Sequence, residues 1–249
     1  MSLQLDLQKS KNVLSLTLQK NGVTKINPCQ VSFAMDASGS FQKEHNQGYT
    51  EHLLGRILPF ALLFDKDGVL DMFSFASSCG EAPEVTEDNY LGYVSRDFPY
   101  KGEYGFSTAY LPPFHALIEN GYTGKEQVVG VEEQGGFFGK LFGKKEKQII
   151  KTTTESIGKH LSFFITDGEA YDQEEAKHYL EKNQEEQHFI IFVTISNSKF
   201  NFFENNYKGK KQTDYFNFTH NELRDLQDKS DEDLYKLFVT PSLTNWMNQ

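Results

Sequence analysis

The stretch Val31-Ser-Phe-Ala-Met-Asp36-Ala-Ser38-Gly-Ser40 decides the fold. It begins as a short apolar run and ends in one carboxylate and two hydroxyls, spaced Asp-x-Ser-x-Ser. A short apolar run of this kind is typical of a strand buried on both faces of a sheet. Open α/β sheets bind their ligands just beyond the carboxyl ends of such strands. We therefore expect Asp36, Ser38 and Ser40 at a sheet edge, where their oxygens suit a hard cation such as Mg²⁺.

Further apolar runs extend the same pattern along the chain. We expect further strands over residues 69–75, 161–166 and 189–195, and Asp167 directly follows the second of these runs. Helical spacing of apolar residues predicts a helix over 53–62, and a charged helix is expected over 173–187. Because strands alternate with helices, we predict an α/β fold with right-handed βαβ units. This implies a doubly wound, mostly parallel sheet with helices on both faces.

The two ends of the chain suggest a simple domain organisation. Residues 1–28 contain two alternating runs, Leu3 to Leu7 and Val13 to Leu18, which predict an N-terminal strand or hairpin added as an antiparallel edge. Residues 29–249 are expected to form one domain. Within it, residues 131–151 are rich in Gly, Phe and Lys, and they are interpreted as a flexible insertion.

Composition narrows the class of protein. The chain has 249 residues with 22 Phe and 12 Tyr, enough apolar material for a core. Its net charge of −10 argues against a general nucleic-acid binder, because phosphate contacts need a basic face. No run approaches the roughly 20 apolar residues of a transmembrane helix, and the N-terminus does not resemble a signal peptide. Cys29 and Cys79 are not in a metal-type pair, so a cytoplasmic location is expected.

Three loops are expected to converge at one edge of the sheet. The first carries Asp36, Ser38 and Ser40, the second lies around Thr108, and the third carries Asp167. With these residues the chain resembles a von Willebrand factor A (vWA) domain with a metal-ion-dependent adhesion site (MIDAS). Asp36-x-Ser38-x-Ser40 matches the first motif of that family, Thr108 its second-loop threonine, and Asp167 in Ile-Thr-Asp-Gly its third-loop aspartate.

More narrowly, the chain resembles the vWA domain of bacterial tellurium-resistance proteins, the TerF-like group. The resemblance rests on short motifs in the right order, over about residues 13 to 247. They include Phe64-Asp-Lys-Asp-Gly68, Thr108-Ala-Tyr-Leu-Pro112 and Asn245-Trp246. Two features depart from the family pattern: Phe41 stands where the family has Met, and the second loop reads Gly105-Phe-Ser-Thr108.

The resemblance implies a Rossmann-like vWA fold and a set of metal ligands. Ser38, Ser40 and Thr108 would hold Mg²⁺, with Asp36 and Asp167 in the outer shell; Ca²⁺ and Mn²⁺ are alternative ions. An ion with neutral ligands attracts an acidic residue from outside, so the expected partner is another protein that presents Asp or Glu. The resemblance therefore implies a scaffold or adaptor, not an enzyme, in a tellurium-resistance or stress-response complex.

Two alternatives remain open at this stage. The same Mg²⁺ could polarise a phosphoryl oxygen in a metal-assisted phosphohydrolase, although the sequence has no P-loop and no Gly-x-Ser-x-Gly motif. A structural vWA domain with a vestigial metal site is the other alternative. Separately, the basic and aromatic segment Phe137–Lys145 suits weak contact with a membrane or a partner, although its glycines favour a flexible surface loop.

Overall fold

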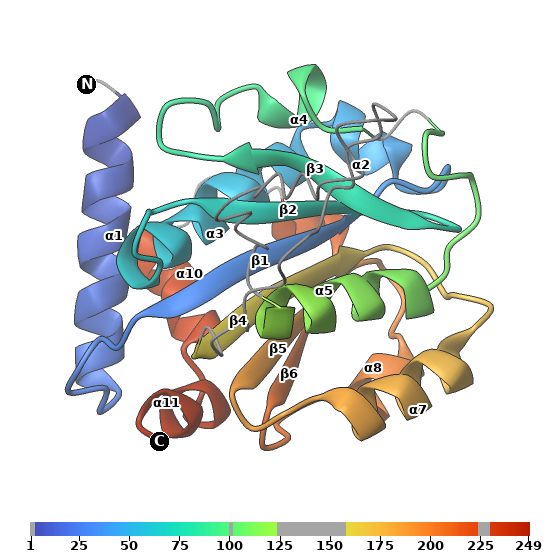
Figure 1. Cartoon of the computed structure of the whole chain (residues 1–249). Coiled ribbons are helices and arrows are strands. Elements are labelled where there is room, and N and C mark those ends of the chain that lie inside the picture. Colours follow the sequence, from blue (N-terminus) through green and yellow to red (C-terminus); the bar gives the residue numbers. More distant parts are fainter. Residues whose placement is uncertain (1–2, 100–101, 124–157, 224–229) are drawn as a thin grey trace, which may run out of the picture.

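A six-stranded sheet forms the centre of the computed structural model, which describes residues 3–99, 102–123, 158–223 and 230–249 (Figure 1). The strand order is β3-β2-β1-β4-β5-β6, and every neighbouring pair is parallel except β2–β3. The strands are β1 (Cys29–Asp36), β2 (Leu70–Phe75), β3 (Cys79–Val85), β4 (Lys159–Thr166), β5 (His188–Ile195) and β6 (Thr213–Phe218). The predicted mostly parallel α/β sheet is confirmed.

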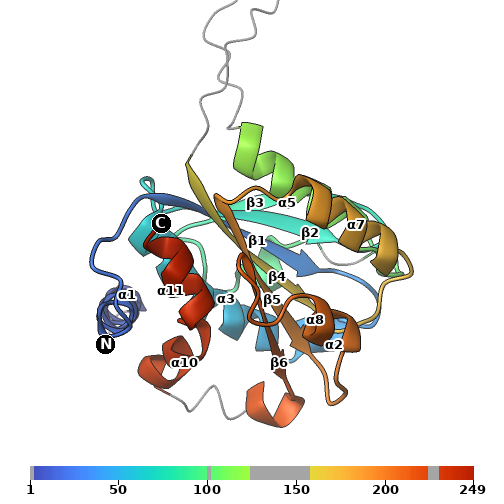
Figure 2. The same ribbon diagram turned by 90° about the horizontal axis from the view of Figure 1, so that it is seen from below.

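Helices cover both faces of the sheet, as predicted. On one face, β1 turns Phe33 and Met35 towards a core completed by α1 (Leu3–Lys20), α3 (Tyr49–Phe64), α10 (Asp231–Phe238) and α11 (Pro241–Met247). On the other, Ala34 faces a second core with α5 (Leu111–Thr123), α7 (Gln173–Asn183) and α8 (Asn201–Asn206). Figure 2 shows α5, α7 and α8 on one side of the sheet and α1, α10 and α11 on the other.

Two further short helices lie close to α3. They are α2 (Gln42–Asn46), which follows the Asp-x-Ser-x-Ser loop, and α4 (Tyr93–Arg96). No helix in the described ranges is long and apolar enough to cross a bilayer. The predicted insertion at 131–151, including Phe137–Lys145, lies outside the described residues.

The N-terminal prediction was wrong, because α1 is a helix where alternating strands were expected. Its buried residues are Leu7, Ser10, Leu14, Thr17 and Leu18, a helical spacing that places them on one face against α3 and α10. Leu16, which completes the apparent alternation, is 53% exposed.

The antiparallel edge of the sheet is β3 instead of the N-terminus. β3 carries Pro83, which an edge strand tolerates because it has no neighbour on one side. Its residues alternate poorly between buried and exposed, which leaves little strand signal in the sequence.

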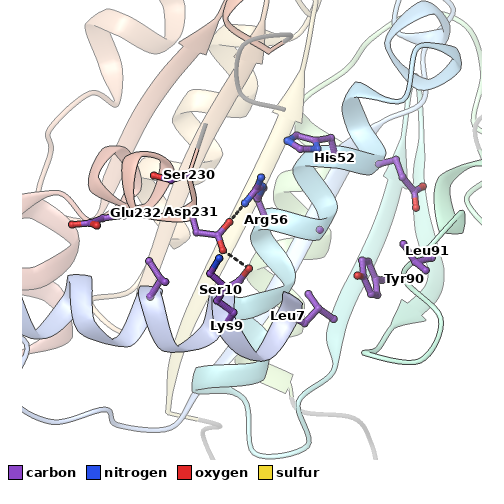
Figure 3. Close-up of a pocket in the computed structure, with 13 residues that line it drawn as sticks. Leu7, Lys9, Ser10, His52, Arg56, Tyr90, Leu91, Ser230, Asp231 and Glu232 are labelled. Atoms are coloured by element: carbon purple, nitrogen blue, oxygen red, sulfur yellow. Dashed lines mark hydrogen bonds and ion pairs between the residues drawn. The ribbon is translucent and has the colours of Figure 1, made fainter. Parts of the chain in front are cut away.

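A mostly buried ion pair fastens α1 and α10 to α3. Arg56 of α3 pairs with Asp231 at the start of α10, and the hydroxyl of Ser10 on α1 donates to Asp231 Oδ2 at 2.6 Å (Figure 3). These residues line a pocket of about 670 Å³ that also includes Tyr90 and Leu91. None of the five predicted metal residues lines it.

Asp231→Asn is expected to lower the free energy of unfolding by about 1–3 kcal/mol, because the enclosed guanidinium of Arg56 loses its charged partner. Urea denaturation measures this change. Glu232→Gln is the matched control: Glu232 makes exposed pairs with Lys20 and Lys236, so little change is expected. Equal stability of wild type and Asp231→Asn would contradict a structural role for the pair.

Two buried histidines lie at the amino ends of β4 and β5. The rings of His160 and His188 stack with centroids 4.5 Å apart and planes 8° from parallel. Nε2 of His160 lies 2.8 Å from Ser32 Oγ, and Nε2 of His188 lies 2.7 Å from Ser162 Oγ. Burial lowers the pKa of His160 to about 3 and that of His188 well below its ordinary value. Both rings are therefore neutral in the folded protein at pH 7.

His160→Gln is expected to reduce the loss of stability in acid. The unfolded chain protonates this histidine below about pH 6.5, whereas the folded chain resists protonation until about pH 3. Across that window the unfolded state binds more protons, so the free energy of unfolding falls as the pH falls. Urea denaturation at about pH 7.5 and about pH 5 should show a smaller drop for His160→Gln than for wild type.

His178→Gln, which alters an exposed histidine of α7, serves as the control and should show the wild-type drop. The same drop in all three proteins would show that His160 does not contribute to acid sensitivity.

Candidate metal centre

The candidate site begins at the carboxyl ends of β1 and β4, which pair in parallel. Met35 is registered with Ile165, so the next residues, Asp36 and Thr166, meet at the sheet edge. Thr166 Oγ1 donates to Asp36 Oδ2 at 2.5 Å, and the backbone N–H of Ser38 donates to Asp36 Oδ1 at 2.7 Å. Both oxygens of this fully buried carboxylate therefore have a partner, and the second bond turns the chain into the first loop.

Hydrogen bonds connect the first loop to the third. Ser38 Oγ lies 3.2 Å from Ser40 Oγ, and Ser40 Oγ donates to Asp167 Oδ1 at 3.0 Å. Ser38 is buried, whereas Ser40 is exposed. A series of hydrogen-bonded residues thus runs from the buried Asp36 through Ser38 and Ser40 to Asp167 near the surface.

Thr108 joins this group from the second loop. The hydroxyls of Thr108 and Ser40 both lie next to Gly168. A Cβ placed on this glycine would be 3.7 Å from Thr108 Oγ1 and 3.9 Å from Ser40 Oγ. The backbone holds Thr108 in place, because Ala109 N donates to Ala76 O at 2.9 Å at the end of β2. The structure therefore brings together side chains of all three predicted loops around Gly168.

The two aspartates are held in an environment that disfavours their charge. Burial raises the pKa of Asp36 to about 6, although hydrogen bonds from Thr166 and Ser38 act in the opposite direction. Burial, and then the charge of Asp36, raise the pKa of Asp167 to about 7. The carboxylate of Glu44 on α2 raises both further. A nearby cation would favour the charged forms of these groups.

A histidine that the sequence did not single out supports the first loop from behind. His45 Nε2 donates to the backbone carbonyl of Asp36 at 2.8 Å, and His45 Nδ1 lies 2.9 Å from Thr50 Oγ1. Burial lowers the pKa of His45 to about 4, so the ring is neutral at pH 7. With Nε2–H as the donor, Nδ1 accepts from the hydroxyl of Thr50. His45 therefore positions Asp36 and does not reach the candidate site itself.

Two more residues position the second and third loops. Tyr110 donates its hydroxyl to the carbonyl of Gly168, which ties these loops together. Asp172 accepts from the backbone N–H groups of Tyr110 and Leu111, at 2.8 and 2.9 Å, at the start of α5. Neither role has a local signal in the sequence, because each contact joins segments about 60 residues apart.

The described residues include no group of three or more His, Cys, Asp and Glu side chains placed to hold a metal ion. The candidate site is of a different kind, in which hydroxyl oxygens stand beside two carboxylates. An α/β sheet with such loops at its carboxyl edge defines the vWA class of protein. The chain belongs to the vWA-TerF-like family: the family model, described as vWA found in TerF C terminus, matches residues 28–249. The resemblance found in the sequence is confirmed.

Two proteins that resemble this chain match it only distantly or in part. The uncharacterized protein YcbR of Bacillus subtilis (strain 168) is 30% identical over 93 residues, which cover 37% of each chain. Proximal thread matrix protein 1 (PTMP1) from the mussel byssus is similar in structure, with a TM-score of 0.52 at 16% identity over 85% of this chain and 46% of that one. The matches span less than half the length of either relative.

Another structure of the mussel protein, described with a zinc-occupied MIDAS motif, has a TM-score of 0.49 at 15% identity. It covers 86% of this chain and 46% of that one. At these identities the likeness to PTMP1 is one of fold alone.

Thr166→Val is expected to lower the free energy of unfolding by about 1–3 kcal/mol, because Asp36 Oδ2 loses its donor in a buried site. Thr166→Ser is the matched control, since it keeps the hydroxyl and should retain most of the stability. Chemical denaturation of the two variants tests the contact. Equal stability of Thr166→Val and Thr166→Ser would show that the hydroxyl bond to Asp36 contributes little.

Proposed function

We propose that this chain is a metal-dependent protein-binding module. Ser38, Ser40 and Thr108 would hold Mg²⁺, with Asp36 and Asp167 as outer-shell partners. The observation that carries this proposal is the series of hydrogen bonds that joins Asp36, Ser38, Ser40 and Asp167 at one edge of the sheet. Thr108 approaches the same residues beside Gly168.

The donor set fits a hard divalent cation. Mg²⁺ prefers oxygen ligands in octahedral geometry, keeps several waters, and takes few carboxylates. Hydroxyl oxygens are neutral, so an ion held directly by them retains most of its charge. The two carboxylates that would balance this charge have raised pKa values because they are buried or crowded by other acids. A cation between them would favour their ionised forms.

An incompletely neutralised ion at a sheet edge attracts an anionic ligand. Gly39 and Ser40 are exposed, so a ligand can reach the candidate metal site from solvent. We propose that the ligand is the side chain of an Asp or Glu on another protein, which would complete the coordination of the ion. Direct contact between the bound ion and a partner carboxylate would make the interaction depend on the metal.

Family membership supports a role for the whole protein. Because the chain belongs to the vWA-TerF-like family, we propose a scaffold or adaptor role in a bacterial tellurium-resistance or stress-response complex. We place this role in the cytoplasm, where the two free cysteines, Cys29 and Cys79, would remain reduced.

Calorimetric titration with Mg²⁺ tests the metal site. Wild type is expected to bind the ion, and Asp36→Asn and Thr108→Ala should each weaken binding by at least about tenfold, because each removes or misorients a ligand. Ser198→Ala is the matched control, since Ser198 is an exposed serine beyond the end of β5 at the same sheet edge. It should bind like wild type.

Absence of heat with Mg²⁺, together with an unchanged melting temperature, would contradict the proposal and favour a vestigial site. Hydrolysis of phosphoesters by wild type that is lost in Asp36→Asn would instead favour the phosphohydrolase.

A further inference from the structure

Two large apolar side chains stand out on the surface of the described residues. Phe106 is 71% exposed and Tyr171 is 73% exposed, more than any other large hydrophobic residue in these ranges. Phe106 lies two residues before Thr108, and Tyr171 lies four residues after Asp167. Both therefore belong to loops of the candidate metal site, on segments more than 60 residues apart in the chain.

The backbone of Phe106 is firmly held although its ring is exposed. Its carbonyl accepts from the N–H of Gly39 in the first loop at 3.0 Å. Gly102 and Gly105 adopt positive φ angles of 83° and 101°, so the loop depends on glycine at both positions. A Cβ on Gly102 would come within 2.8 Å of the Phe106 ring, and one on Gly105 would collide with Ser77 Oγ. The loop is thus closely packed beneath an exposed aromatic ring.

The backbone of Tyr171 is tied to the same place. Its N–H donates to the carbonyl of Thr108 at 3.4 Å. Its neighbours are also fixed, because Ala170 is buried and Asp172 accepts from two backbone N–H groups of α5. Phe106 is therefore anchored to Gly39 of the first loop, and Tyr171 to Thr108 of the second.

Rigid, exposed aromatic residues are typical of binding surfaces. Burying them in a complex releases water from apolar area, and little side-chain freedom is lost because an aromatic side chain has only two rotatable bonds. A firmly held backbone reduces the ordering cost of association further. Among the described residues neither ring belongs to a core of the protein, so both present apolar area beside the candidate ligand site.

The charges around the site limit what the partner can carry. Glu169 and Glu103 are exposed on the third and second loops, and the whole chain has a net charge of −10. A partner with several adjacent acidic residues would be repelled by these groups, so only the one carboxylate that meets the metal would be favoured.

We propose that Phe106 and Tyr171 form an apolar docking surface around the metal, and that it takes a protein segment with a single Asp or Glu flanked by aromatic or aliphatic side chains. This inference rests on the proposed function, since the acidic residue is the one that the metal would bind. It adds that the residues next to this Asp or Glu are apolar. This requirement distinguishes such a partner from any other acidic segment.

Selection from a display library of random dodecapeptides tests this inference with the full chain in Mg²⁺ and in EDTA. Peptides enriched only in Mg²⁺ should carry one acidic residue beside apolar residues, without acidic neighbours. Their affinity, measured by titration, should fall about tenfold for Phe106→Ala and for Tyr171→Ala, the loss typical of an interface anchor. Tyr171→Phe keeps the ring and should bind like wild type.

Leu237→Ala is the matched control, since Leu237 is an exposed apolar residue of α10. It should bind the selected peptides like wild type. Thermal melting of each variant establishes that its fold is intact, as expected for changes at exposed side chains.

The outcomes separate the two proposals. Peptides that need Mg²⁺ but lack apolar neighbours, or that bind both alanine variants as well as wild type, would overturn the docking surface and leave the metal-dependent binding module in place. Enrichment that is equal in Mg²⁺ and EDTA, or no enrichment at all, would overturn the binding module and the docking surface with it.

Discussion

Parallel pairing of β1 with β4 brings the carboxylate of Asp36 within 2.5 Å of the hydroxyl of Thr166, and the rest of the site is arranged around this contact. The other oxygen of Asp36 accepts from Ser38 N and so sets the direction of the first loop. From there, Ser40 reaches Asp167 on the third loop. A buried carboxylate without partners would be costly, so these contacts both stabilise the charge and fix the loops.

Supporting contacts behind the loops make the site rigid. His45 holds the backbone of Asp36, Tyr110 binds the carbonyl of Gly168, and Asp172 holds the start of α5. All three act on backbone atoms, so they position the loops without occupying the place of a ligand. These loops present Phe106 and Tyr171 to solvent beside the candidate site. The residues of the candidate metal site and the two exposed aromatic rings therefore lie on the same loops.

Much of the site could be predicted from local sequence because its chemistry is local. Asp36, Ser38 and Ser40 follow a buried strand within five residues, and Asp167 follows another. The edge of the sheet was harder to predict. In α1 the run Leu14, Leu16, Leu18 alternates like a strand, yet Leu14 and Leu18 pack on α3 and α10 while Leu16 faces solvent. β3 carries a proline and little periodicity, because an edge strand is paired on only one side.

By itself the sequence determined the class of fold and the kinds of oxygen atom at the sheet edge. Apolar runs of strand length specify buried strands, and residues at their ends lie at one edge of a parallel sheet wherever the strands pair. Only the tertiary structure decided that Thr108 joins Ser40 beside Gly168, and that His45 and Tyr110 hold the loops from behind. Those contacts join distant segments, and their geometry depends on the packing of helices and strands that no short stretch of sequence encodes.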